Sequence, residues 1–204
     1  MKKYPLLNYM GSYAQELLYE TSNSALLGIP EALKNATHKI YTQSKLNNEA
    51  LYYLQVRTFL ETLDLDEKEI SKFMQEHPDH QRLGLEIFKI LENTLIEKQA
   101  IMLAKTFKLY ASGHLSKQNF DKYTYIITKL NQHLINLLQE LFFLKTNNED
   151  PEFEFDVSNP NMELVSFQFL REVESPLVLD GKTKIARYKR TDGFYHFYEN
   201  IFKD

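Results

Sequence analysis

The spacing of apolar residues between Glu97 and Phe143 predicts two helices joined by one short turn. In the second helix apolar residues recur at intervals of three and four from Phe120 to Leu141, which places them on one face. A helix over 116–144 would be about 40 Å long, and the sequence leaves open whether it is broken near its middle. The first helix has a comparable face that consists of Ala100, Leu103, Ala104, Phe107, Tyr110 and Ala111.

The turn between these helices has the residues of one helix end followed by a new helix start. Gly113 stands where many helices end in a left-handed residue, and Ser116 is a favourable N-cap for the next helix. The turn also resembles the second half of a calcium-binding EF-hand loop. Calcium, however, would need acidic oxygens before Gly113 and a glutamate after it, and neither is present. We therefore predict a helical hairpin and no calcium site.

Helical periodicity also precedes this stretch. A first helix is predicted over 4–22, and a second follows Pro30, with Asn47-Asn48 either interrupting it or starting the next helix. A short charged helix begins near Asp66 and stops before Pro78, where Asp79 is a candidate cap for the helix that follows.

The pattern changes after Thr146. An acidic linker is predicted over 147–160, and beyond it a short helix, two strands around Asp180-Gly181, and a last helix capped at Thr191. Helix, hairpin and helix in this order form the closing half of a winged-helix unit. We therefore predict a mainly α fold, with a multi-helix bundle over 1–146 and a small α+β, winged-helix-like tail over 161–204.

Composition limits the chemistry. The chain has 204 residues, 43% hydrophobic and 25% charged, which is typical of a folded globular domain. It contains no cysteine, which excludes disulfides, thiolate metal sites and cysteine nucleophiles. No apolar run reaches the roughly 18 residues of a membrane span, and the first residues lack the apolar core of a secretory signal. The cytoplasm is the expected compartment.

The remaining candidate chemistry is sparse. His77, Asp79 and His80 are close enough in sequence to share a metal, but the segment reads better as a polar turn between two helices. His133 on the long helix is expected to be structural. With no nucleophile elbow and no phosphate-binding loop, we predict no catalytic residue, no metal and no cofactor.

Two segments of the C-terminal part could bind a partner. The predicted hairpin is basic, and it could contact a nucleic-acid backbone or simply keep an edge strand soluble; its cations are Lys182, Lys184, Arg187, Lys189 and Arg190. The acidic and aromatic segment 152–156 could present Phe153 and Phe155 to a protein partner, or fold these rings onto the helical body.

Residues of the central stretch also carry a family resemblance. They are Phe59, Leu60, Leu63, Lys98, Leu103, Lys105, Phe107, Lys108, Leu109, Tyr110, Gly113, Leu115 and Phe120. Together they resemble the core pattern of uncharacterised bacterial and phage-borne helical proteins with a winged-helix-like tail. The resemblance covers residues 25–143. In the tail it is weaker, because Gln168 and Phe169 depart from the usual turn and Gly193 comes one place early. The central turn is similar to that of TerB-type helical domains by analogy only.

No activity comes with this resemblance, so it implies a location in bacteria or their mobile elements and no chemistry. The expected function is a non-catalytic interaction or regulatory module that contacts a protein of unknown identity. A homodimer is left open, because the long helix has enough apolar residues for a core and for a dimer seam. DNA binding through the basic hairpin is the alternative, although a net charge of −4 does not favour it. A helical enzyme without a standard motif is the third reading.

Overall fold

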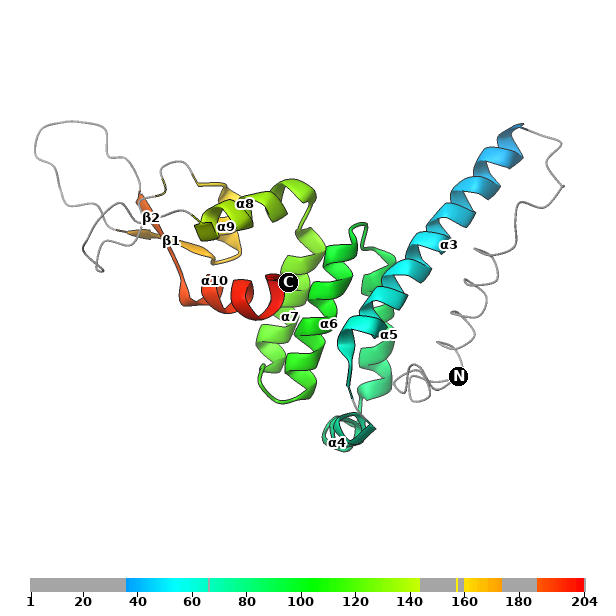
Figure 1. Ribbon diagram of the computed structural model, residues 1–204, viewed down its shortest axis with the longest axis horizontal. Coiled ribbons are helices and arrows are strands. Elements are labelled where there is room, and N and C mark those ends of the chain that lie inside the picture. Colours follow the sequence, from blue (N-terminus) through cyan, green and yellow to red (C-terminus); the bar gives the residue numbers. More distant parts are fainter. Residues whose placement is uncertain (1–35, 66, 144–156, 158–159, 174–186, 204) are drawn as a thin grey trace, which may run out of the picture. The chain divides into compact units, whose positions relative to one another are not determined.

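The computed structural model describes most of the chain from residue 36 onward, and it is mainly helical with a small antiparallel hairpin near the C-terminus (Figure 1). The described residues are 36–65, 67–143, 157, 160–173 and 187–203. The helix predicted over 4–22 lies outside them. The chain divides into two units, Met1–Lys129 and Leu130–Asp204, and each is described by itself below. The predicted fold class is confirmed.

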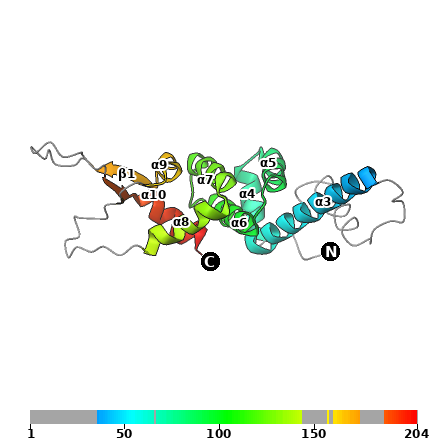
Figure 2. The same cartoon turned by 90° about the horizontal axis from the view of Figure 1, so that it is seen from above.

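Five helices are described in the first unit: α3 (Ala36–Leu63), α4 (Glu67–Glu76), α5 (His80–Glu92), α6 (Glu97–Ala111) and α7 (Lys117–Lys129). Helix α3 runs through Asn47 and Asn48 without interruption. Figures 1 and 2 show α6 between α3 and α7, in agreement with its contacts to both helices. The Thr58 hydroxyl lies 3.3 Å from the Glu97 carboxylate, and the Lys108 ammonium lies 3.2 Å from the Asp64 carbonyl. These two contacts show that α3 and α6 run in the same direction.

The core of the first unit is built around α6. All six residues of its predicted apolar face are buried, and Gln99, Met102 and Thr106 are buried as well. The Phe107 ring lies 6.2 Å from the Phe59 ring, 5.3 Å from the Phe73 ring and 6.3 Å from the Phe120 ring. Burying one such side chain stabilises a fold by about 1.5–3 kcal/mol. A single residue of α6, Phe107, therefore contacts α3, α4 and α7.

The turn between α6 and α7 has the predicted geometry. Gly113 has a φ of +77°, and the amides of Gly113 and His114 donate to the carbonyls of Tyr110 and Leu109. These two bonds define a Schellman C-terminus, in which the left-handed residue strongly favours glycine. Ser116 Oγ accepts a hydrogen bond from the Asn119 amide, as expected of an N-cap.

The long helix predicted over 116–144 is divided by Leu130 and Asn131 into α7 and α8 (Gln132–Phe143). Asn131 Oδ1 accepts a hydrogen bond from the Leu134 amide at 2.9 Å and so caps the start of α8. The division between the two units falls at this break, whereas the sequence predicted a boundary after residue 146. Helical periodicity continues across the break, so the pattern of apolar residues did not reveal it.

Gln99 joins the start of α6 to the end of α7, opposite the turn of this helical hairpin. Its side-chain oxygen accepts from the amides of Leu95 and Ile96 at 3.0 and 3.1 Å, just before α6 begins. Its side-chain nitrogen donates to the Ile127 carbonyl at 2.9 Å, in the last turn of α7. That carbonyl is one of the four that a helix leaves without an internal partner at its C-terminus. Gln99 therefore stabilises the start of α6 and the end of α7 together.

The second unit places a short hairpin beside helices. After α8 come α9 (Met162–Ser166), β1 (Leu170–Val173), β2 (Arg187–Arg190), α10 (Asp192–Phe197) and a π-helical turn η1 (Tyr198–Phe202). Strands β1 and β2 are antiparallel, and Val157 forms an isolated antiparallel bridge with Tyr188 of β2. The first strand begins at Leu170. Thr191 Oγ1 accepts from the Phe194 amide, which confirms the predicted cap of the last helix.

Aromatic rings fill the core of the second unit. Phe169 lies 5.9 Å from Phe194 and 5.0 Å from Phe197, and all three are almost completely buried. The rings of Phe142 and Tyr198 are stacked at 3.9 Å, which fixes the end of α8 against η1. None of the helices in the described part of the chain is long and apolar enough to cross a membrane.

The first prediction concerns Gly113. The Gly113→Ala substitution should lower the free energy of unfolding by about 1–2 kcal/mol, because alanine is strained at a positive φ. Steric contact adds nothing, since a Cβ at Gly113 would meet no atom within 4 Å. Gly193→Ala in the first turn of α10 is the matched control and should be neutral or slightly stabilising, because its Cβ would meet only Thr191 Oγ1, at 3.5 Å. Urea unfolding followed by circular dichroism measures both changes; equal effects would contradict the left-handed turn.

The second prediction concerns Gln99. The Gln99→Leu substitution should destabilise the protein by about 1–3 kcal/mol for each buried group left without its partner. The control is Gln118→Leu in α7, because Gln118 is exposed and should change stability by less than about 0.5 kcal/mol. Hydrogen exchange at Leu95 and Ile96 reports the same contact directly. Unchanged exchange at these amides in Gln99→Leu would show that the side chain does not hold them.

Candidate functional site

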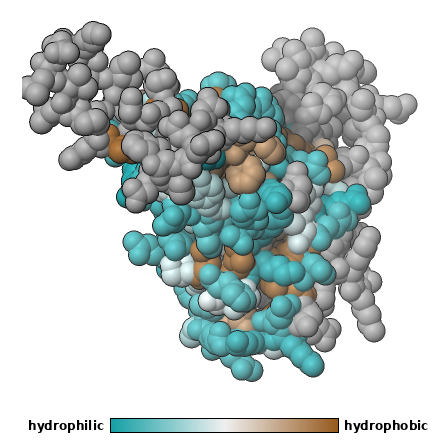
Figure 3. All heavy atoms as spheres, turned by 60° about the vertical axis from the view of Figure 1, so that its left-hand side comes forward, coloured by the Kyte–Doolittle hydropathy of each residue, from teal (hydrophilic) through white to brown (hydrophobic). Residues whose placement is uncertain are grey.

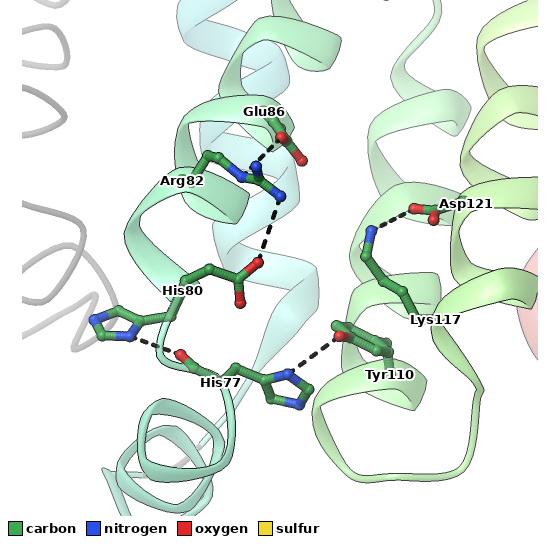
Figure 4. Close-up of polar contacts among 8 residues, drawn as sticks. His77, His80, Arg82, Glu86, Tyr110, Lys117 and Asp121 are labelled. Carbon is green, nitrogen blue, oxygen red and sulfur yellow. Dashed lines mark hydrogen bonds and ion pairs between the residues drawn. The ribbon is translucent and has the colours of Figure 1, made fainter.

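The segment from His77 to His80 forms a polar turn between α4 and α5 (Figure 4). The His77 amide still donates to the Phe73 carbonyl, and Pro78, which has no amide hydrogen, follows the end of α4. Asp79 occupies the N-cap position of α5, but its side chain makes no cap hydrogen bond. The predicted cap is therefore wrong in its chemistry: the carboxylate lies 3.6 Å from the Arg82 guanidinium instead.

His77 and Tyr110 join this turn to the end of α6. The His77 Nδ1 atom and the Tyr110 hydroxyl are 3.2 Å apart and share a hydrogen bond (Figure 4). The imidazole also lies 4.5 Å from the Phe73 ring and 5.0 Å from the Tyr110 ring. On its other side Tyr110 is stacked on Phe120 at 4.8 Å. These four rings form a continuous aromatic cluster that links α4, α6 and α7.

Burial raises the pKa of Tyr110 above its ordinary value of 10.0. The ammonium of Lys117 acts in the opposite direction, while the carboxylates of Asp79 and Asp121 raise the pKa further. Lys117 is itself ion-paired with Asp121 one turn along α7. Tyr110 therefore keeps its proton at neutral pH, and its hydroxyl serves as a hydrogen-bonding group rather than as a base.

The Nδ1 atoms of His77 and His80 contact different groups. His80 Nδ1 lies 2.9 Å from the His77 backbone carbonyl, whereas His77 Nδ1 bonds Tyr110 (Figure 4). Within the part of the chain that the structure describes, no three His, Asp or Glu side chains are grouped so that they could hold a metal ion. His133, the other histidine weighed from the sequence, is exposed on α8.

The structure describes only some of the five cations of the predicted basic hairpin, and these differ in exposure. Lys182 and Lys184 lie outside the described residues, and for Arg187 only the backbone, at its place in β2, is described. Lys189 is partly exposed, while Arg190 is only 9% exposed. The candidate partner-binding residues Phe153 and Phe155 also lie outside the described residues, four and two positions before Val157.

Arg190 is directed into the second unit. Its guanidinium donates to the carbonyls of Leu141 and Phe142 at 3.0 and 3.2 Å, and it lies 5.2 Å from the Tyr195 ring. A cation at the C-terminal end of a helix is favoured by the partial negative charge there. Any phosphate would have to compete with these internal contacts, so Arg190 is better described as a cap of α8.

Two exposed leucines of the first unit were not singled out from the sequence. Leu54 on α3 is 53% exposed, and Leu95, in the connection before α6, is 75% exposed. Leu54 lies one helical turn before Thr58, and Thr58 bonds Glu97, two residues after Leu95. The two leucines are therefore on the same side of the contact between α3 and the start of α6. Figure 3 shows hydrophobic areas among the mainly hydrophilic described atoms of the face it presents.

No family model matches this sequence, and comparisons with curated proteins and with solved structures find no significant match. The resemblance to bacterial and phage-borne helical proteins therefore stays a prediction. The function has to be argued from the geometry of the two units.

The third prediction follows from Tyr110. A phenol whose folded-state pKa lies above its unfolded value stabilises the fold below pH 10.0, and this contribution is lost as the pH rises through the folded pKa. Tyr110→Phe should therefore weaken the fall of stability in alkali, although loss of the His77 bond should cost about 0.5–1.5 kcal/mol at neutral pH. Tyr123, whose pKa burial also raises, should still contribute to the alkaline loss.

Urea unfolding at a series of pH values tests this. The matched control is Tyr125→Phe, because the Tyr125 side chain is 59% exposed; this variant should keep the pH dependence of the unchanged protein. An identical alkaline profile for Tyr110→Phe and Tyr125→Phe would refute the role assigned to Tyr110.

Proposed function

We propose that this protein is a non-catalytic interaction or regulatory module that binds another protein. The observation that carries the proposal is the pair of exposed leucines, Leu54 on α3 and Leu95 in the connection before α6. The proposal that the protein belongs to a bacterium or to a mobile element of bacteria rests on the family resemblance alone.

The leucine pair has the chemistry of a contact point. Leu54 lies on α3, and Leu95 lies two residues before Glu97 of α6, whose carboxylate is bonded to Thr58 of α3. Covering one leucine side chain completely is worth about 1.5–3 kcal/mol, and only part of that value remains to be gained here because each is already partly covered. The apolar area that a partner could cover on these two side chains is the source of binding energy in this proposal. The polar residues around them suit a contact that forms and dissociates.

The polar groups of the first unit support a non-catalytic role. His77 and Tyr110 bond each other within an aromatic cluster, and Tyr110, whose pKa burial raises further above 10.0, is protonated at neutral pH. The Gln99 side chain hydrogen-bonds the start of α6 and the end of α7. Each of these side chains has a structural task that accounts for its position. A partner protein other than a second copy is favoured, because the described exposed leucines are few and Leu134, Leu138 and Leu141 of α8, which were left open for a dimer seam or a core, are buried.

The fourth prediction is that the double substitution Leu54→Gln with Leu95→Gln weakens partner binding. Tagged full-length protein is used to recover partners from a bacterial lysate, and each recovered protein is then purified and its affinity measured directly. A partner that depends on both leucines should bind the double variant at least about tenfold more weakly, which corresponds to about 1.4 kcal/mol.

The control is Leu85→Gln on α5, because Leu85 is an exposed leucine of the same unit and its substitution should leave the affinity unchanged. A second pair, Phe153→Ser with Phe155→Ser, tests the other predicted contact separately. Light scattering of the unchanged protein shows whether it is a monomer. A clean monomer with no partner, or a partner retained equally by all variants, would count against the proposal.

A further inference from the structure

The two faces of the β1–β2 hairpin differ in charge. The register pairs Leu170 with Arg190 and Arg171 with Lys189. Because side chains alternate along a strand, these two pairs point to opposite faces. Burial agrees, since Leu170 and Arg190 are buried whereas Arg171 is exposed and Lys189 partly exposed. At these two pairs the hairpin thus has an inner side that packs on the unit and an outer side that carries two cations directly opposite each other, whereas Glu172, farther along the inner side, is exposed.

This outer pair is electrostatically unfavourable in isolation. Directly opposed side chains in antiparallel strands have Cβ atoms about 4.5–5.5 Å apart, and like charges in that position are destabilising. The ion pairs of the described residues include neither Arg171 nor Lys189. The outer face therefore concentrates positive charge without a described acidic partner.

Cations on the helices behave differently. In the described ion pairs each cation has an acid three or four residues away, as in Arg57–Glu61, Lys72–Glu76 and Lys89–Glu92. Such local pairing is the usual arrangement on a solvated helix. Arg171 and Lys189 are in none of these described ion pairs, and an external anion would relieve the repulsion between them.

We propose that the outer hairpin face, defined by Arg171 and Lys189, binds the phosphate backbone of a nucleic acid. The forked guanidinium of arginine matches two phosphate oxygens, and lysine acts as a point charge beside it. A nucleic-acid backbone supplies evenly spaced negative charge whatever its sequence, which suits two cations on a narrow two-stranded ribbon. An acidic polypeptide would have to place its carboxylates individually. Arg190 is not part of this face, because it caps α8.

This site is independent of the leucine pair proposed above, so either proposal can fail alone. It is also distinct from the basic set expected from the sequence, because Arg171 of β1 enters and Arg190 leaves. The mode is contact with the backbone, so binding should show little dependence on base sequence.

The fifth prediction is tested by fluorescence anisotropy with the full chain, using duplex DNA, single-stranded DNA and single-stranded RNA of mixed sequence over a series of salt concentrations. The slope of log affinity against log salt should fall by roughly 0.9 for each cation removed when duplex DNA is the ligand. The double substitution Arg171→Gln with Lys189→Gln should therefore lower the slope by roughly 1.8. Comparison of the three probes shows which backbone is preferred.

The matched control is Lys72→Gln with Arg82→Gln, because it removes the same charge from ion-paired positions on α4 and α5 and should leave the slope unchanged. The exchanged variant Arg171→Lys with Lys189→Arg keeps both charges and should retain binding. The proposal is overturned if no probe binds at low salt, or if the control lowers the slope as much as the hairpin variant. It is also overturned if polyglutamate displaces the nucleic acid at equal charge concentration, because the face would then be a site for acidic polypeptides.

Discussion

The side-chain amide of Gln99 is the contact on which the arrangement of the first unit depends. It accepts from two amides at the start of α6 and donates to a carbonyl at the end of α7. Helix ends leave such groups without internal partners, and a buried polar group without a partner costs more than an ordinary hydrogen bond contributes. One buried side chain therefore supplies hydrogen-bond partners to the start of α6 and to the end of α7. The chain leaves α7 at Leu130, and the second unit begins at that point.

The second unit uses a comparable contact. Arg190 closes the last turn of α8 by donating to the carbonyls of Leu141 and Phe142, and Phe142 is stacked on Tyr198. In both units a helix C-terminus is closed by a side chain that is remote in sequence. The contact in the second unit has a consequence for the surface. Because strand residues alternate between faces, an inward Arg190 requires an outward Lys189, and the hairpin acquires a structural face and a cationic one.

Local features were predictable from the sequence, and contacts between distant residues were not. The buried face of α6, the left-handed Gly113 and the Thr191 cap each depend on residues a few positions apart, and the structure confirms them. The roles of Gln99 and Arg190 depend on partners 28 and 49 positions away, which no periodicity reports. The break at Asn131 was hidden because apolar spacing continues through it. Similarly, alternation indicated a hairpin but could not fix where β1 begins.

The overall charge of the protein constrains how its cationic face can act. With 24 basic and 28 acidic residues, the whole chain repels a polyanion at long range. At an ionic strength of 0.1 M, however, charges are screened beyond about 10 Å, so only cations close to the phosphates contribute. The surplus of acids therefore slows the approach of a nucleic acid without preventing contact at the hairpin. Such a site gains affinity from few charges and loses it readily to salt, so it is suited to positioning a nucleic acid that another contact holds.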